Sequence, residues 1–343
     1  MEAIEKPRKD QGAELVQTAI PKMGPSDVLI KIKATSICGT DVHIYDWTDW
    51  ARNRMHPPTI FGHECCGDIV EAGKSVESVS VGDFVSTETH LADWTCEQCK
   101  TGHAHICENL KLIGVDRPGV FAEYAAVPAT SVWINDPKMS PIVATTQEPL
   151  GNAIHTVFKG DVVGKTVGVF GLGPIGICAA LVCMHAGAES VIAVETIDYR
   201  IKLAKKLGVE ITINALDSDP VKEISSLTGG RGIDVLLEMS GSERALLSGL
   251  GALRPGGRAS ILGLYSEPVR LDVNELIVTK DLTVHGVYGR IMWDTWYKVA
   301  SLLRSKAIDL ERLVTHQFQG LSKFEEAMMT MKSRQSGKIV LFP

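Results

Sequence analysis

Residues 167–176 read VGVFGLGPIG, and this run decides the class of fold. It overlaps an apolar, strand-like stretch, Thr166–Phe170, and it opens a helix-like stretch. The spacing of its glycines is G-x-G-x-x-G. In that pattern Gly171 permits a tight turn, Gly173 lets the backbone approach a pyrophosphate at the helix N-terminus, and Gly176 allows close packing of helix against strand. The run therefore predicts a dinucleotide-binding βαβ unit.

The sequence that follows this run repeats the alternation of strand and helix. Taken alone, the three glycines could serve only a turn, so the surrounding pattern decides the prediction. Such alternation is typical of a doubly wound α/β domain with a parallel sheet, which we place at residues 151–290. We expect strands at Thr166–Phe170, Ser190–Val194, Glu210–Ile213, Ile233–Glu238 and Arg258–Leu262, and helices at Pro174–Ala186, Asp198–Leu207 and near Pro220–Leu227.

Glu195 stands at the end of the second predicted strand. A carboxylate at this position hydrogen-bonds the adenosine ribose hydroxyls of a dinucleotide, and its charge repels a ribose phosphate. Arg200 is an opposing signal, because an arginine near this position can accommodate that phosphate. We expect NAD rather than NADP.

The first 150 residues have a different pattern. Short β-rich runs, such as Val28–Ala34, Gly67–Ala72 and Asp83–Thr87, are separated by Gly, Pro and Asp, which predicts a β-barrel-like domain with long loops. The total of 343 residues supports two domains, since single cores stop growing at about 250–300 residues.

Charge and hydropathy exclude several classes of partner. A net charge of -6 gives no reason to expect nucleic acid or an anionic membrane surface as a partner. The N-terminus mixes acids and bases without an apolar stretch, and the most apolar run, Val167–Met184, is interrupted by Gly171, Gly173, Pro174 and Gly176. We expect a cytoplasmic protein with a small-molecule substrate.

Cys38, His63 and Glu64 form the first candidate metal site. A thiolate, an imidazole and a carboxylate, all on loops of the β-rich domain, suit a catalytic zinc ion that keeps one position open for water or substrate. Each residue has an ordinary alternative, as a small buried residue, a loop histidine or a surface acid. Their combination with a dinucleotide fold favours the metal.

A second cluster reads Asp93-x-x-Cys96-x-x-Cys99-x7-Cys107. Three cysteines at this spacing indicate a structural zinc lobe, and because zinc also accepts carboxylate oxygen, Asp93 can be the fourth ligand. The alternative is a zinc-free loop with reduced thiols. The other cysteines have no such spacing, and we expect them in the core: Cys65, Cys66, Cys178 and Cys183.

These motifs resemble the zinc-containing medium-chain dehydrogenase/reductase family over nearly the whole chain. The resemblance includes Gly62-His-Glu64, the cysteine lobe, the glycine run and the C-terminal Gly337-Lys338. It implies a GroES-like β-barrel catalytic domain at residues 1–150, joined by the C-terminal segment 291–343, and a Rossmann NAD-binding domain at residues 151–290.

The resemblance also implies roles for individual residues. Cys38, His63 and Glu64 would hold the catalytic zinc, with Glu148 beside the metal as an exchangeable ligand. Thr40 and His43 would pass the substrate proton out, and a histidine suits that step because its ordinary pKa lies near neutrality. The lobe usually has four cysteines in this family, and here Asp93 replaces the first. The cofactor-contacting positions would be Gly171, Gly173, Ile175, Gly176, Glu195, Arg200, Leu262, Gly263, Leu264, Val287 and Tyr288.

Within the family, the closest matches are residues 38–47, 148–152, 237–241 and 288–297, and the last of these segments is the most telling. They resemble members that oxidise L-threonine at C3 to 2-amino-3-oxobutanoate, and they imply NAD, zinc and a homotetramer. The nearer alternative is a polyol or secondary-alcohol dehydrogenase with the same cofactor and metal. The farther one is a catalytically silent nucleotide-binding protein, which would need none of Cys38, His63, Glu64, Thr40 and His43.

Overall fold

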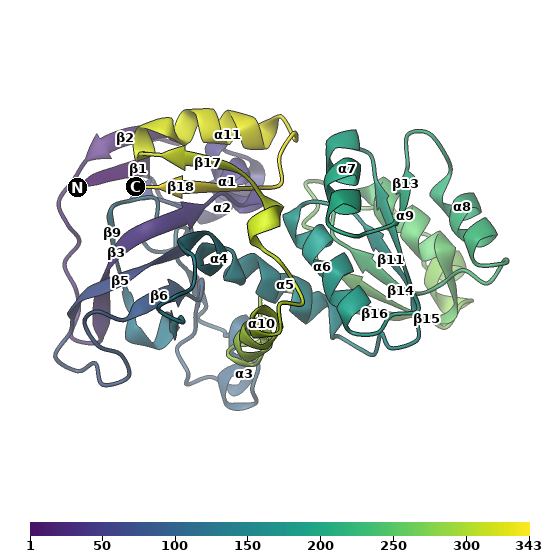
Figure 1. The fold of residues 1–343 in the computed structure, drawn as a ribbon, viewed down its shortest axis with the longest axis horizontal. Coiled ribbons are helices and arrows are strands. Elements are labelled where there is room, and N and C mark those ends of the chain that lie inside the picture. The colour runs from purple at the N-terminus through teal and green to yellow at the C-terminus, as the bar shows by residue number, and fades with distance from the viewer. The chain divides into compact units, whose positions relative to one another are not determined.

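The computed structural model describes residues 1–343, and the chain divides into two compact units. The first unit joins Met1–Glu148 with Leu310–Pro343, and the second is Pro149–Asp309. In Figure 1 the yellow C-terminal strands and helix lie beside the purple N-terminal strands, within the same unit. No helix combines the length and the apolar character that crossing a membrane requires.

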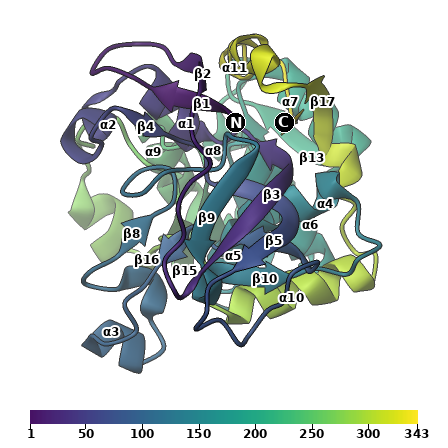
Figure 2. The ribbon, with the colours of Figure 1, turned by 90° about the vertical axis from the view of Figure 1, so that its left-hand side faces the viewer.

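The first unit is built mainly from β-strands. Seven of them form one sheet, in the order β10-β6-β5-β3-β18-β17 with β9 also paired to β3 (Figure 2). β3 is antiparallel to β5, β9 and β18, so the last strand of the chain is paired with the central strand of the sheet. The strands are β3 (Asp27–Ser36), β5 (Glu64–Ala72), β6 (Phe84–Thr87), β9 (Tyr124–Pro128), β10 (Val132–Ile134), β17 (Val314–Gln319) and β18 (Lys338–Phe342).

The first unit also contains smaller strands and helices outside this sheet. β2, β1 and β4 form a three-stranded sheet, and β7 pairs with β8. One core cluster packs Phe61, Phe121 and Phe324 edge to face, and so joins the N-terminal and C-terminal segments. The elements are β1 (Glu2–Lys6), β2 (Glu14–Gln17), α1 (Gly39–Tyr45), α2 (Asp49–Arg54), β4 (Thr59–Ile60), β7 (His90–Leu91), α3 (Glu97–Lys100), β8 (Lys111–Leu112), α4 (Pro141–Thr145) and α11 (Phe324–Lys332).

The second unit is a six-stranded parallel sheet in the order β13-β12-β11-β14-β15-β16. The strand order reverses between β11 and β14, which makes the carboxyl ends of these two strands the switch point where dinucleotides bind in such folds. The strands are β11 (Thr166–Phe170), β12 (Ser190–Glu195), β13 (Ile211–Asn214), β14 (Ile233–Glu238), β15 (Leu253–Ile261) and β16 (Thr283–Gly286).

Helices accompany these strands as the alternation predicts (Figure 1). They are α5 (Gln147–Val157, which begins in the first unit), α6 (Pro174–His185), α7 (Asp198–Lys206), α8 (Pro220–Leu227), α9 (Glu243–Ala252) and α10 (Asp294–Arg304). The doubly wound fold class is confirmed, and so is the placement of Cys65, Cys66, Cys178 and Cys183 in the core.

The division between the units differs from the predicted one in one segment. Residues 291–309, expected to join the N-terminal domain, lie in the second unit. Contacts just before this segment and within it reach α5 and the residue that follows α5. Arg290 Nη1 donates to Asn152 Oδ1 at 3.1 Å, and His155 Nδ1 lies 2.9 Å from the Gly289 carbonyl oxygen. Lys298 of α10 lies over the ring of Phe158, 5.7 Å from its centre.

Candidate functional site

Cys38 stands at the N-terminus of α1, where a short turn fixes its backbone. Asp41, three residues on, accepts a hydrogen bond through Oδ2 from the Cys38 N–H at 2.8 Å. The other oxygen of Asp41 lies 3.5 Å from His63 Nδ1. Asp41, which is fully buried, thus links the backbone of Cys38 to the imidazole of His63. Asp41 lies within the motif Cys38–His43, but no pattern in the sequence indicated that its carboxylate contacts Cys38 and His63.

Cys38, His63 and Glu64 meet at the amino end of β5. Their ligand atoms all lie within 4.8 Å of one another, and His63 and Glu64 are buried. Sulfur, nitrogen and oxygen donors in such a group suit zinc, and three protein ligands leave a fourth position for a substrate oxygen. The structure thus brings together the three residues that the sequence grouped.

Glu64 is held by partners from three other segments, β3, α4 and β18. Its carboxylate accepts hydrogen bonds from Ser36 Oγ and from Lys338 Nζ, the latter at 2.7 Å to Oε1. Its carbonyl oxygen accepts from the hydroxyls of Thr35, at 2.8 Å, and Thr145, at 3.2 Å. These bonds fix both the backbone and the carboxylate of a candidate metal ligand.

Lys338, on the last strand of the chain, is a buried cation that the sequence did not single out as a site residue. Its ammonium also donates to the Ile37 carbonyl oxygen at 2.9 Å. Burial alone would lower the pKa of Lys338, but the charge and hydrogen bond of Glu64, together with the nearby Cys38 and Glu148, outweigh burial and raise the pKa. The lysine therefore stays charged and compensates the buried carboxylate.

Glu148 lies outside the group of three ligand atoms but is linked to it. The Thr89 hydroxyl lies 3.0 Å from Glu148 Oε1 and 3.2 Å from the His63 carbonyl oxygen. Glu148 is buried, with 5% of its surface exposed. A buried carboxylate beside a candidate metal cluster is compatible with the exchangeable ligand that the resemblance implies.

Thr40 and His43 lie on α1, one turn apart, on the helix that Cys38 begins. The Thr40 hydroxyl is 4.0 Å from the sulfur of Cys38, and His43 Nδ1 is 3.4 Å from the hydroxyl of Thr48. Burial lowers the pKa of His43, although the nearby charge of Asp46 opposes the shift. His43 is therefore a neutral base at pH 7, which suits the acceptance of a proton.

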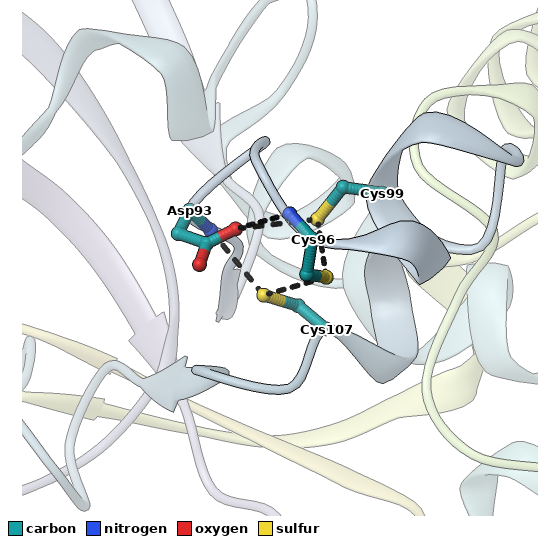
Figure 3. A group of neighbouring side chains, drawn as sticks. All are labelled: Asp93, Cys96, Cys99 and Cys107. Atoms are coloured by element: carbon teal, nitrogen blue, oxygen red, sulfur yellow. Dashed lines mark hydrogen bonds between the residues drawn. The ribbon is translucent and has the colours of Figure 1, made fainter.

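The second cluster is formed by Asp93, Cys96, Cys99 and Cys107, whose ligand atoms also lie within 4.8 Å of one another. Figure 3 shows the four side chains pointing toward a common centre. The Cys96 and Cys99 sulfurs are 3.5 Å apart, and the Cys96 and Cys107 sulfurs 3.8 Å. Three sulfurs and one carboxylate at this spacing match a four-coordinate zinc site.

Asp93 keeps its charge through hydrogen bonds from its own loop. Asn109 Nδ2 donates to Oδ2 at 2.6 Å, and the Thr95 N–H donates to Oδ1 at 2.8 Å. The bond from Asn109 is the main cause that lowers the pKa of Asp93. Asp93 is thus an ionised oxygen donor facing three cysteines.

The glycine turn of the second unit has the geometry that a dinucleotide needs. Gly171 has φ +98°, and a side chain at Gly176 would place its Cβ 1.9 Å from the Gly171 carbonyl oxygen. A Cβ at Gly173 would meet nothing nearer than Arg200 Nη1, at 4.0 Å. The backbone is therefore open to a ligand at the N-terminus of α6, where the free N–H groups favour a phosphate.

Glu195 ends β12 beside this turn. Its carboxylate accepts from the N–H of Leu172 and from that of Thr196, each at 2.7 Å, and Arg200 Nη1 lies 3.9 Å from Oε2. The remaining predicted cofactor positions follow the carboxyl ends of β15 and β16, on the same edge of the sheet. They are Leu262, Gly263, Leu264, Val287 and Tyr288, and Ile175 lies in the first turn of α6.

Comparisons with known proteins agree with this arrangement. The model of the alcohol dehydrogenase GroES-like domain matches residues 24–136, and the model of the zinc-binding dehydrogenase domain matches residues 174–305. The first covers both candidate metal clusters, and the second covers the glycine turn from Pro174 onward together with Glu195.

Whole-chain relatives extend the comparison. The L-threonine 3-dehydrogenase of Pyrococcus furiosus is 49% identical over 340 residues, which cover 99% of this chain and 98% of that protein. The L-threonine 3-dehydrogenase of Bacillus subtilis is 46% identical over 343 residues, which cover 100% of this chain and 99% of that protein. Among solved structures, 2R,3R-butanediol dehydrogenase from Bacillus subtilis matches with a TM-score of 0.87 and 28% identity, covering 100% of this chain and 99% of the other.

Proposed function

The chain belongs to the zinc-containing medium-chain dehydrogenases, and we propose from that premise that it oxidises L-threonine at C3 with NAD, giving 2-amino-3-oxobutanoate. The observation on which this rests is the 49% identity over 99% of the chain to a protein named for this reaction. The butanediol dehydrogenase, at 28% identity, is a more distant relative.

Cys38, His63 and Glu64 would hold the catalytic zinc. When bound, zinc acts as a Lewis acid that makes the substrate hydroxyl more acidic, and NAD accepts the hydride from C3. Asp41 keeps the imidazole of His63 oriented, and Lys338 balances the charge of Glu64. The protein therefore supplies three ligand atoms that neighbouring residues hold in place in a buried site.

The proton of the substrate hydroxyl would leave through Thr40 and His43. The Thr40 hydroxyl lies beside the thiol of Cys38 and can accept and donate a hydrogen bond. His43, one helical turn further, is neutral because burial lowers its pKa, and it can therefore take up the proton. Glu148 would serve as the exchangeable ligand near the metal, held by Thr89.

NAD would bind at the carboxyl edge of the parallel sheet. The open backbone at Gly173 supports a pyrophosphate contact, and Glu195 supports the choice of NAD over NADP. Arg200 lies close enough to Glu195 to balance part of its charge. The lobe of Asp93, Cys96, Cys99 and Cys107 would hold a second, structural zinc ion.

A substrate panel tests the proposed reaction. Zinc-loaded protein with NAD should form NADH with L-threonine at a rate far above that with sorbitol or butane-2,3-diol. A preference for either diol would replace the proposal with the secondary-alcohol alternative. No NADH with any of the three substrates would favour the silent nucleotide-binding alternative.

The assembly and the cell compartment belong to the same proposal. We infer a homotetramer that works in the cytoplasm, where NAD and free amino acids are available. Light scattering of the purified protein gives the mass of the assembly, and a mass other than four chains would reject the tetramer. Fractionation of cells tests the compartment.

A further inference from the structure

Glu238 is a fully buried carboxylate at the carboxyl end of β14 that the proposed reaction does not use. Its Oε1 accepts from the Ser240 N–H at 2.8 Å, from the Ser240 hydroxyl and from the Gly241 N–H at 3.2 Å. Its Oε2 accepts from the hydroxyl of Tyr265 at 2.8 Å. One carboxylate therefore collects donors from the loop after β14 and from the loop after β15.

The backbones of these two loops are also in direct contact. The Glu238 carbonyl oxygen accepts from the N–H of Leu262 at 2.9 Å and from that of Gly263 at 3.2 Å. A Cβ added to Gly263 would lie 2.1 Å from the Gly241 nitrogen and 2.5 Å from Glu238 Oε2. A Cβ on Gly241, which has φ +66°, would lie 2.3 Å from the Leu264 carbonyl oxygen. Leu262, Gly263 and Leu264 thus take their position from contacts around Glu238.

The place of this cluster in the sheet indicates which part of NAD it serves. β14 is the neighbour of β11 across the switch point, and a Cβ on Gly171 would lie 2.9 Å from the Ser240 nitrogen. In a sheet of this order, the half containing β11 and β12 receives the adenosine end, and the half beginning at β14 receives the nicotinamide end. The loops joined by Glu238 therefore belong to the nicotinamide half.

Burying a carboxylate at position 238 costs free energy, so a purely packing role does not explain this residue. A buried carboxylate is unfavourable unless hydrogen bonds replace its water. Burial, together with the charge of Glu238, raises the pKa of Tyr265, so that hydroxyl remains a donor. The strongest hydrogen bonds available to neutral donors are those to an ionised acceptor. The carboxylate of Glu238 can therefore order the two loops, which contain Gly241 and Gly263, through the hydrogen bonds that it accepts.

We propose that Glu238 is a positioning residue that fixes the loops 238–241 and 262–265 in the conformation that receives the nicotinamide half of the cofactor. The inference rests on the proposed use of NAD. It assigns no contact between Glu238 and the cofactor, since the carboxylate acts through the loops that it ties together.

The test compares two ligands that share the adenosine end. NADH and ADP-ribose are titrated into the zinc-loaded full chain, with binding followed by calorimetry. In Glu238→Gln the dissociation constant of NADH should rise about tenfold, the loss expected for hydrogen bonds to a charged group. The dissociation constant of ADP-ribose should stay within about twofold, as expected for a site that the change does not touch.

Asp234 on the same strand provides the matched control. It is a buried carboxylate near the opposite end of β14, where it accepts from the Thr166 N–H and from Arg254. Asp234→Asn should lower thermal stability and leave the ratio of the two dissociation constants unchanged. Tyr265→Phe keeps the carboxylate of Glu238 and removes one of its donors. It should raise the dissociation constant of NADH by about threefold or more and leave that of ADP-ribose unchanged. If Glu238→Gln does not fold, this variant tests the inference instead.

Equal weakening of both ligands in Glu238→Gln and in Tyr265→Phe would reduce Glu238 to a structural role and overturn the inference. Unchanged affinity for NADH in both variants would also overturn it. Failure of the native protein to bind NADH would instead reject the proposed function, so the two failures are distinguishable.

Discussion

Two clusters of metal-ligating side chains lie in the first unit, and they are built in opposite ways. Cys38 precedes α1, whereas His63 and Glu64 lie together at the start of β5, and Glu64 is paired with Lys338, 274 positions further along the chain. The lobe, by contrast, takes all its ligands from residues 93–107, and the side-chain partner of Asp93 is Asn109. The first cluster forms only when distant parts of the chain fold together, whereas the ligands of the lobe come from one short loop.

Each cluster contains one carboxylate, and the surroundings of the two carboxylates differ. Glu64 is fully buried and compensated by an ammonium, whereas Asp93 is partly exposed and stabilised by an amide and backbone N–H groups. The comparison teaches that ligand identity alone does not separate a catalytic site from a structural one. Burial, a compensating charge and a nearby base distinguish the first cluster.

The largest effect is expected from the loss of His43, the proposed base near the first cluster. His43→Asn should lower turnover about a hundredfold or more near pH 7, as expected for the loss of a general base, with partial recovery at high pH, where hydroxide takes the proton. In the native protein the pKa of His43 lies below its ordinary 6.5, so activity should fall only as the pH drops through that lowered value. Rates measured from pH 5 to 10 test both statements.

His103 near the lobe is the matched control, since it is an exposed histidine whose Nδ1 lies 3.3 Å from the hydroxyl of Thr101. His103→Asn should leave the pH profile unchanged. An unaltered profile in His43→Asn would remove His43 from the mechanism.

The compensating charge is the next difference. Lys338→Met leaves Glu64 buried without its cation, and such a change costs about 3–5 kcal/mol of unfolding free energy. Asn109→Ala removes the partner of Asp93, where solvent can replace the lost bond, and should cost much less. Urea unfolding of both variants gives the comparison. Similar losses of unfolding free energy in the two variants would show that the two carboxylates do not differ in how much they depend on their partners.

The smallest effect is expected at the lobe itself. A carboxylate is a harder donor than a thiolate, and zinc in structural sites favours sulfur. Asp93→Cys should therefore raise the zinc retained under chelator and modestly raise the melting temperature, without a change in turnover. A fall in turnover in this variant would mean that the two clusters are not independent.

The sequence predicted the local features of this protein better than the distant ones. The glycine turn, Glu195 and the cysteine lobe lie in short motifs whose spacing reflects backbone geometry, and the resemblance to a family grouped Cys38 with His63 and Glu64. Lys338 was not assigned because its partners, Ile37 and Glu64, lie far away along the chain, and Glu238 was not assigned because no short pattern links it to Tyr265. Residues 291–309 fall in the second unit, which differs from the predicted division, and Lys298 of this segment lies over the ring of Phe158.

Native mass spectrometry of the protein and of Cys38→Ser, with NADH formation from L-threonine measured on the same samples, tests the account most directly. The account predicts about two zinc ions and activity in the native chain, because each cluster offers a complete ligand set. It predicts about one zinc ion and no turnover in the variant, with NADH still bound. Undiminished zinc and full activity in Cys38→Ser would contradict it.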